Sequence, residues 1–129
     1  MHRCVSHATH FVVAAFVSVS AHAQTHRSFA PQTLRGEMVV TQAPDVLVNG
    51  QPGRLSPGSR IRGDTNLLVM PGSIAGQKNN VHYTLSEDGQ VKDVWILNPA
   101  ELANKVWPRT LLESSTWAFE PGTQTWIRK

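Results

Sequence analysis

Residues 81–97, with the sequence VHYTLSEDGQVKDVWIL, decide the fold class. Two runs rich in apolar residues flank Ser86-Glu87-Asp88-Gly89, and the glycine stands where a bulged turn requires a positive φ. Polar and apolar side chains alternate in the first run, which places Val81 and Tyr83 on one face and His82 on the other. We therefore predict an antiparallel β-hairpin at this point of the chain.

The second run of this hairpin is apolar on both faces from Val94 to Leu97. A strand of this kind is covered twice, by the core on one face and by another segment on the other. The C-terminal third of the chain can supply that segment, because Asn98-Pro99 provides an N-cap and a first-turn proline for a short helix that reaches about Val106. We expect residues 98–129 to cover the strand.

Short apolar runs separated by Gly, Pro, Asn and Asp occupy the chain before this hairpin. Such punctuation is typical of an all-β domain. Asn49-Gly50 predicts a second tight hairpin, because both residue types tolerate the positive φ that its turn demands. The predicted strands span residues 37–41, 46–48, 59–62, 67–70, 81–85 and 91–97.

Short strands and frequent glycines predict a mainly β fold, a small antiparallel barrel of the OB-like or SH3-like kind. A short C-terminal helix follows, and Thr110 with Glu113 forms a capping box for a second helical turn. Two alternating strips around Pro121-Gly122 predict a terminal hairpin. Its apolar side carries Trp117, Phe119 and Trp126.

The beginning of the chain resembles a cleavable secretory signal. Residues 11–21 are apolar or small, fewer than the about 20 that a membrane-spanning helix needs, and Ala21-His22-Ala23 fits the signal peptidase pattern. The alternative is a buried N-terminal helix. We expect a signal peptide over 1–23, a flexible lead-in over 24–35, and one β-rich domain over 36–129 with a Trp-rich extension over 98–129. The processed protein is then periplasmic or secreted, with no integral membrane segment.

Composition narrows the possible partners and chemistry. Cys4 is the one cysteine and is lost with the predicted signal, so the processed chain has no disulfide and no thiol nucleophile. The formal net charge is +3, with the two signs mixed along the chain. Because a nucleic-acid binder usually shows a basic stripe, this pattern disfavours nucleic acid as a partner.

Three stretches carry a resemblance: RGEMVVTQ at 35–42, VLVNGQPGRLSPGSRIRG at 46–63 and KDVWILNPAE at 92–101. They resemble a group of short exported proteins of Gram-negative proteobacteria that have no assigned function. The resemblance implies a periplasmic or extracellular location. It implies no catalytic or binding residue.

Three arginines form the most suggestive polar group. Arg60 and Arg62 project from the same face of one predicted strand around an inward-pointing Ile61, with Arg54 nearby in the sequence. Such a group can bind a phosphate, a carboxylate or an acidic partner. Solvated charge on an edge strand, which discourages aggregation, explains the same pattern.

Four tryptophans lie between Trp95 and Trp126. Exposed, they would form a stacking platform for a ligand; buried, they would add the apolar area that a domain without disulfides needs. Trp95 is flanked by Val94 and Ile96, which favours the core. We expect Trp107, beside Pro108, to be the tryptophan that reaches the surface and takes part in binding.

His82 and Asp93 are the candidates for catalytic or metal chemistry. With His26, His82 makes only two histidines in the processed chain, too few for a usual metal site, and we interpret it as an exposed strand residue. Asp93 lies on the same side of its strand as Trp95, where desolvation would raise its proton affinity; an ion pair with Arg60 or Arg62, or plain exposure, is the alternative.

Motifs of known enzymes are absent from the sequence, including G-x-S-x-G, H-E-x-x-H, S-x-x-K and the P-loop. The sequence therefore favours a non-enzymatic exported domain that binds an unknown protein or a small-molecule ligand, without catalytic residues, metal or cofactor. The alternative is a small hydrolase or metal-dependent protein centred on His82 and Asp93; a hydrolase would have to assemble its site from these two residues and Ser73.

Overall fold

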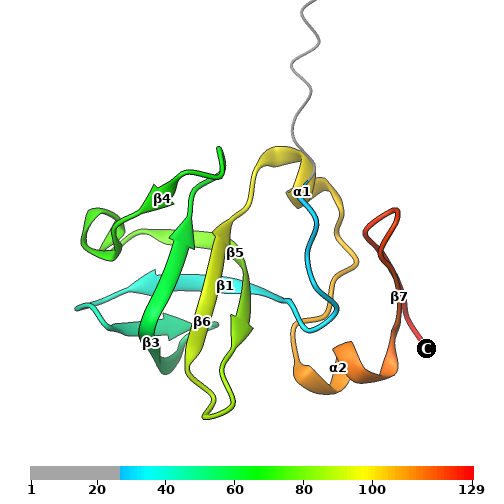
Figure 1. Ribbon diagram of the computed structural model, residues 1–129, viewed down its shortest axis with the longest axis horizontal. Helices are drawn as coiled ribbons and strands as arrows, with labels where there is room; N and C mark the ends of the chain where they lie inside the picture. Colours follow the sequence, from blue (N-terminus) through cyan, green and yellow to red (C-terminus); the bar gives the residue numbers. More distant parts are fainter. Residues whose placement is uncertain (1–26) are drawn as a thin grey trace, which may run out of the picture.

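A computed structural model describes residues 27–129 (Figure 1). The signal peptide predicted over 1–23 lies outside these residues. The elements are β1 (Leu34–Val40), β2 (Asp45–Val48), β3 (Gln51–Arg62), β4 (Leu68–Val69), the 3-10 helix η1 (Pro71–Ile74), β5 (Lys78–Leu85), β6 (Val91–Ile96), α1 (Pro99–Ala103), α2 (Leu111–Thr116), β7 (Ala118–Glu120) and β8 (Thr125–Ile127). Within residues 27–129, no helix has the length and apolar character required to cross a bilayer.

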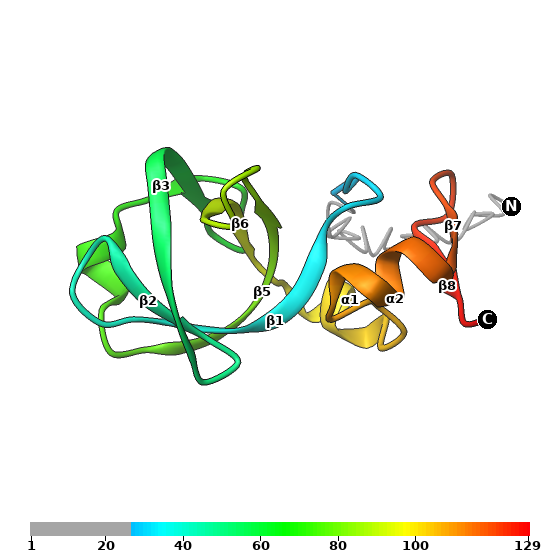
Figure 2. The same ribbon diagram turned by 90° about the horizontal axis from the view of Figure 1, so that it is seen from below.

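Five strands close into a barrel, seen on the left of Figure 2. Their order is β2-β1-β5-β6-β3, β3 pairs back with β2, and the short β4 extends β3. The β3–β6 pair is parallel, whereas the other pairs of the barrel are antiparallel. This parallel pair makes the barrel mixed, whereas the sequence predicted an antiparallel one. The prediction of a small, mainly β barrel is confirmed.

Both predicted hairpins are present, and their turns have the expected backbone. Asn49 and Gly50 adopt φ of 51° and 78° between β2 and β3, as a type I′ turn requires. Gly89 adopts φ of 84° between β5 and β6, and the register of that pair shifts between Tyr83 and Leu85. A bulge therefore accompanies the turn.

The barrel interior is filled by apolar side chains. Alternate residues of β1 point inward, including Leu34, Met38 and Val40, and each is at most 2% exposed. They pack with the inward faces of the other strands, among them Val46, Leu55, Ile61, Val81, Tyr83 and Val94. The barrel interior is therefore a packed core.

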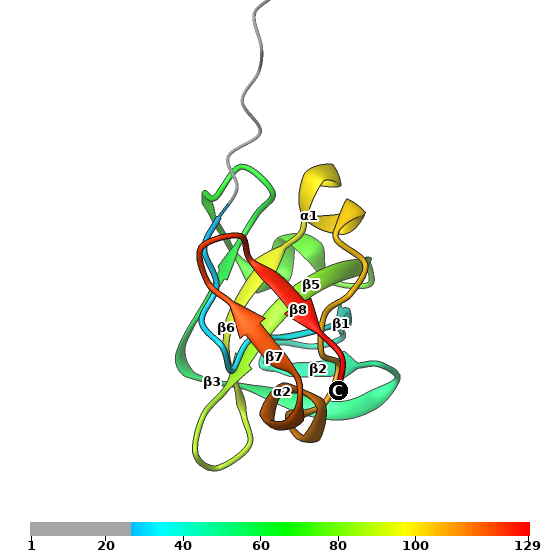
Figure 3. The ribbon, with the colours of Figure 1, turned by 90° about the vertical axis from the view of Figure 1, so that its right-hand side faces the viewer.

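The C-terminal extension covers one outer side of the barrel, as expected for the doubly apolar β6. In Figure 3 the β7–β8 hairpin lies in front of β5 and β6, and α1 and α2 complete the extension. A second apolar cluster fills this contact, with Phe29, Leu97, Trp107 and Trp126 buried and Trp95, Val106, Trp117 and Phe119 packed against them. The extension and the barrel thus share an apolar interface.

The two short helices begin where the sequence predicts. Asn98 and Glu101 form a reciprocal capping box on α1, and the Thr110 side chain accepts a hydrogen bond from the backbone of Glu113 on α2. Helix α1 ends at Ala103 and not near residue 106, because Asn104 leaves the helical conformation with ψ of 90°.

The flexible lead-in predicted over 24–35 is wrong for its described part, residues 27–35. Phe29 is 7% exposed and Thr33 is fully buried, and β1 already begins at Leu34. The physical reason is the second cluster: the Phe29 ring fills it between Trp95 and Trp107, which fixes the chain before the barrel.

Candidate functional site

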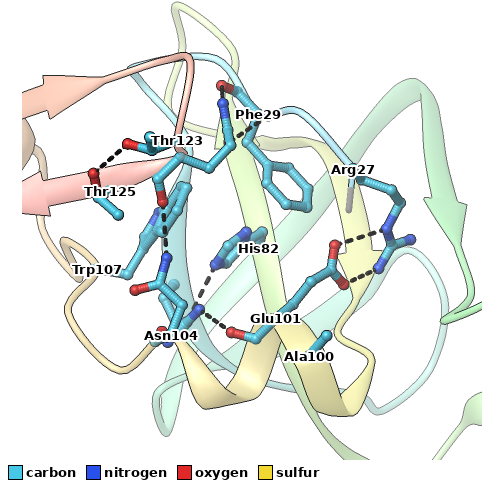
Figure 4. Close-up of a pocket in the computed structure, with 11 residues that line it drawn as sticks. Arg27, Phe29, His82, Ala100, Glu101, Asn104, Trp107, Thr123 and Thr125 are labelled. Atoms are coloured by element: carbon cyan, nitrogen blue, oxygen red, sulfur yellow. Dashed lines mark hydrogen bonds and ion pairs between the residues drawn. The ribbon is translucent and has the colours of Figure 1, made fainter. Parts of the chain in front are cut away.

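A cavity of about 210 Å³ lies where the barrel meets the extension (Figure 4). Its walls come from the segment before the barrel, from the outer faces of β1 and β5, from α1, and from the turn between β7 and β8. It is lined by Arg27, Phe29, Arg35, His82, Ala100, Glu101, Asn104, Trp107 and residues 123–125. Five separate segments of the chain thus contribute to one site.

Strand register places the polar groups of this site side by side. Arg35 of β1 pairs with His82 of β5, and His82 pairs with Trp95 of β6. Side chains at paired positions of neighbouring strands share a face. The three therefore form a row on the outer surface of the barrel, beneath the extension.

His82 occupies the centre of the site, as Figure 4 shows, and is 1% exposed. Its ring stacks on Trp107, with ring centroids 4.2 Å apart, and meets Phe29 edge-on at 4.4 Å. Arg35 Nε donates to His82 Nε2 across 3.1 Å. Burial lowers the pKa of His82 to about 2, and the charges of Arg35 and Arg27 act in the same direction. The imidazole is therefore neutral.

The tautomer of His82 follows from this hydrogen bond. Because Nε2 accepts from Arg35, the single proton of the neutral ring resides on Nδ1. Nδ1 is buried and has no hydrogen-bond partner among residues 27–129. The interpretation of His82 as an exposed strand residue is wrong, because the extension covers its face of β5.

Arg35 is a buried cation with neutral partners. It is 6% exposed, and besides His82 its guanidinium donates to the backbone carbonyls of Glu101, at 3.0 Å, and Asn104. Within residues 27–129, which contain all nine Asp and Glu residues of the chain, no carboxylate lies within 4.0 Å of it. The pKa of Arg35 is lowered to about 10, chiefly by burial and also by the charge of Arg109, while the charge of Glu101 acts in the opposite direction.

Arg27 and Glu101 form a second buried pair in the cavity wall, with side chains 7% and 4% exposed. Two hydrogen bonds of 3.0 and 2.5 Å join the guanidinium to the carboxylate. Arg27 also donates to the carbonyls of Gly63 and Ile96, and Glu101 accepts from the backbone of Asn98. Glu101 is therefore committed to Arg27 and to capping α1.

The β7–β8 turn forms the rim of the cavity and is tied to both sides of it. Gln124 adopts a φ of 53°, and its side chain accepts from the backbone of Phe29 at 2.8 Å. Asn104 donates from Nδ2 to the Gln124 carbonyl at 2.8 Å. Thr123 and Thr125 on either side are exposed, so the cavity opens to solvent at this rim.

The three arginines predicted as a binding group lie on β3, outside this cavity. Arg54 and Arg60 are exposed and Arg62 is half-buried, while Ile61 between the latter two is buried in the barrel as expected. Arg54 pairs in register with Asp45, and Arg60 with Asp93. Among residues 27–129, no side-chain hydrogen bond or ion pair involves any of the three, and the register of β3 against β6 shifts between Leu55 and Arg60, so the structure does not join them into one site.

Trp107 is not the exposed tryptophan that the sequence predicts. It is 4% exposed, and its Nε1 donates to the Thr33 carbonyl at 2.9 Å. Pro108, which suggested a surface turn, instead accepts a hydrogen bond from the backbone of Arg35 and holds the indole against β1. Trp107 nevertheless belongs to the site, since its ring forms one wall of the cavity.

The residues proposed for hydrolysis or metal binding are not assembled into a site. The Asp93 carboxylate contacts Thr84, 3.5 Å away, and forms an ion pair with neither Arg60 nor Arg62. Ser73 donates to the Met70 carbonyl within η1. Among residues 27–129, no hydrogen bond links His82, Asp93 and Ser73, and no three His, Cys, Asp or Glu residues are placed to hold a metal ion.

Sequence reasoning missed Arg27, Arg35 and Glu101. Arg35 and Arg27 lie in the stretch interpreted as a flexible lead-in, and Glu101 was seen only as part of a helix. One signal was available: Glu101 stands three residues after Asn98, the spacing of a capping box.

Comparisons of the chain with protein-family models, with curated proteins and with solved structures find no match.

Proposed function

We propose that this protein is an exported, non-enzymatic binding domain that holds a small molecule between its barrel and its C-terminal extension. Export is supported by the signal-like pattern of residues 1–23. Binding is supported by the cavity, which combines the rings of Phe29 and Trp107 with a few buried polar groups. Ligand sites commonly have this composition.

The cavity itself carries the proposal. It opens to solvent between Thr123 and Thr125, so a small molecule can reach it. Its volume is about 210 Å³, and the buried side chains of Arg35 and His82 line it together with two aromatic rings. A concave, mostly apolar space with a few converging polar groups is the usual form of a small-molecule site.

A catalytic role for His82 receives less support. A general base works best when its pKa lies near the working pH. The pKa of His82 is lowered to about 2, so its ring is a poor proton acceptor at neutral pH. No described hydrogen bond connects it to Asp93, which would be needed to orient it in a triad.

Two alanines of α1 provide a test with a matched control. Ala100 lines the cavity, whereas Ala103, on the same helix, does not. Ala100→Leu should fill part of the cavity, and Ala103→Leu makes the same change of residue outside it. A mixed library of charged and neutral fragments, screened by ligand-detected NMR, should give hits with the wild type and Ala103→Leu that Ala100→Leu loses.

The spectrum of each protein must first show that it is folded. Fragment binding that survives Ala100→Leu unchanged, or a library without a single hit on the folded wild type, would overturn the proposal.

A further inference from the structure

We propose that the ligand of this cavity is a small carboxylate, whose anionic group binds the guanidinium of Arg35 and whose compact apolar body lies against Phe29 and Trp107. This inference rests on the proposed function and specifies its substrate class. It depends on three features of the described residues: an unneutralised buried charge, unused donors and the shape of the space.

The charge comes first. Buried charged groups are usually paired with an opposite charge, because an isolated one loses its hydration without compensation. Arg35 has neutral acceptors only, from His82, Asn104 and Glu101. The carboxylate of Glu101 is already bound to Arg27, so the two arginines and one glutamate leave the cavity wall with one positive charge. A monoanion balances it.

Unused donors point to the same group. A guanidinium carries five N–H groups, and three of those on Arg35 have an acceptor within residues 27–129: the one on Nε and one on each Nη. One N–H remains on each Nη nitrogen. A carboxylate has two oxygens that can accept from these two donors, and bidentate binding of this kind distinguishes Arg from Lys.

Size and lining restrict the rest of the ligand. A cavity of about 210 Å³ is smaller than the about 300–1,000 Å³ of sites for drug-sized molecules, so the ligand has few atoms. Phe29 and Trp107 meet edge-to-face at 5.8 Å and present ring surface, and Ala100 adds a small apolar contact. A short branched or single-ring carboxylate fits this combination.

Isothermal titration at pH 7 tests the class with matched probe pairs: benzoate against benzamide, and isobutyrate against isobutyramide. The members of each pair have similar shapes and differ in charge. We expect at least one carboxylate to bind at least about tenfold more tightly than its amide. Inorganic phosphate is the third probe and should bind more weakly than that carboxylate.

Two conservative variants locate the charge that is recognised. Arg35→Lys keeps the positive charge but removes the planar fork, and it should weaken carboxylate binding at least about tenfold and amide binding by a smaller factor. Arg109→Lys makes the same change at an exposed arginine that does not line the cavity. It should change carboxylate affinity less than about threefold.

The outcomes separate this inference from the proposed function. Amides that bind as well as carboxylates, or phosphate that binds better, would overturn the carboxylate assignment while the cavity remains a binding site. If neither carboxylate binds, the carboxylate assignment is overturned as well. If the fragment screen gives no hit on the folded wild type, the proposed function is overturned together with the carboxylate assignment. If Arg35→Lys does not fold, the wild-type comparison of carboxylate with amide decides alone.

Discussion

Arg35 Nε and His82 Nε2 lie 3.1 Å apart, at paired positions on β1 and β5, and both side chains are buried beneath the C-terminal extension. The histidine accepts the hydrogen bond, so it holds the guanidinium in place only while it is neutral. A protonated His82 would have no lone pair for Arg35 and would add a second positive charge beside it. The stability of the fold should therefore depend on the protonation of this histidine.

The first prediction is that stability falls as pH drops below 6.5. His82 has a pKa of about 2 in the folded state and 6.5 when exposed, so the unfolded chain takes up a proton that the folded chain refuses. The stabilisation is complete above pH 6.5 and is lost progressively below it, by about 2 kcal/mol between pH 7 and pH 5. Urea unfolding of the wild type and of His82→Phe, which cannot titrate, measures the difference. Equal pH slopes in the two proteins would contradict the buried neutral imidazole.

The second prediction concerns the buried pair of Arg27 and Glu101. Glu101→Gln should lower the free energy of unfolding by about 3–5 kcal/mol, because it leaves the Arg27 guanidinium buried without its counter-ion. Glu113→Gln is the control, since Glu113 stands at the same third position of α2 without a buried arginine. It should cost less than about 1 kcal/mol. Similar costs for the two variants in chemical denaturation would show that Glu101 acts mainly as a helix cap.

A third prediction tests the hairpin between β2 and β3. Gly50 has a φ of 78° with open space around it, so Gly50→Ala should cost about 1–2 kcal/mol through backbone strain alone. Gly72 also has open space but no positive φ, and Gly72→Ala should change stability by less than about 0.5 kcal/mol. Thermal unfolding of both variants checks the contrast. A neutral Gly50→Ala would mean that the turn is not of the primed type.

A fourth prediction tests whether the extension is an integral part of the domain. Trp126 and Ile127 are neighbours on β8, 5% and 64% exposed. Trp126→Ala should destabilise the whole domain by about 3–5 kcal/mol, whereas Ile127→Ala should cost less than about 0.5 kcal/mol. Amide exchange of the barrel strands β1 and β5 reports the effect. If only the hairpin loses protection in Trp126→Ala, the extension unfolds independently of the barrel.

Local signals predicted most of the secondary structure. The alternation in residues 81–85 and the turn at Gly89 gave the β5–β6 hairpin, and Asn49-Gly50 gave the β2–β3 hairpin. The length of β3 was not predictable in this way, because Pro52, Gly53, Pro57 and Gly58 disfavour a strand. The register of β3 against β6 breaks between Leu55 and Arg60, which accommodates Pro57-Gly58 within a twelve-residue strand.

The site was beyond the reach of local signals because it is assembled from non-local contacts. Alternation placed His82 and Tyr83 on opposite faces of the strand, but it does not tell whether the His82 face is exposed or covered. Phe29 and Trp107 cover it, and they lie 53 and 25 residues away in the sequence. No local pattern encodes these contacts. Arg35 likewise resembles an ordinary polar residue before a strand. Only the β1–β5 register brings its guanidinium to His82.

The central claim is that the cavity beside Arg35 binds a small carboxylate, and a crystal structure of the wild-type protein grown with saturating benzoate tests it most directly. We predict density for benzoate in the cavity, with its carboxylate oxygens about 2.7–2.9 Å from Nη1 and Nη2 of Arg35 and its ring against Phe29 and Trp107. A cavity that holds only ordered water, or is closed by the surrounding side chains, would contradict it.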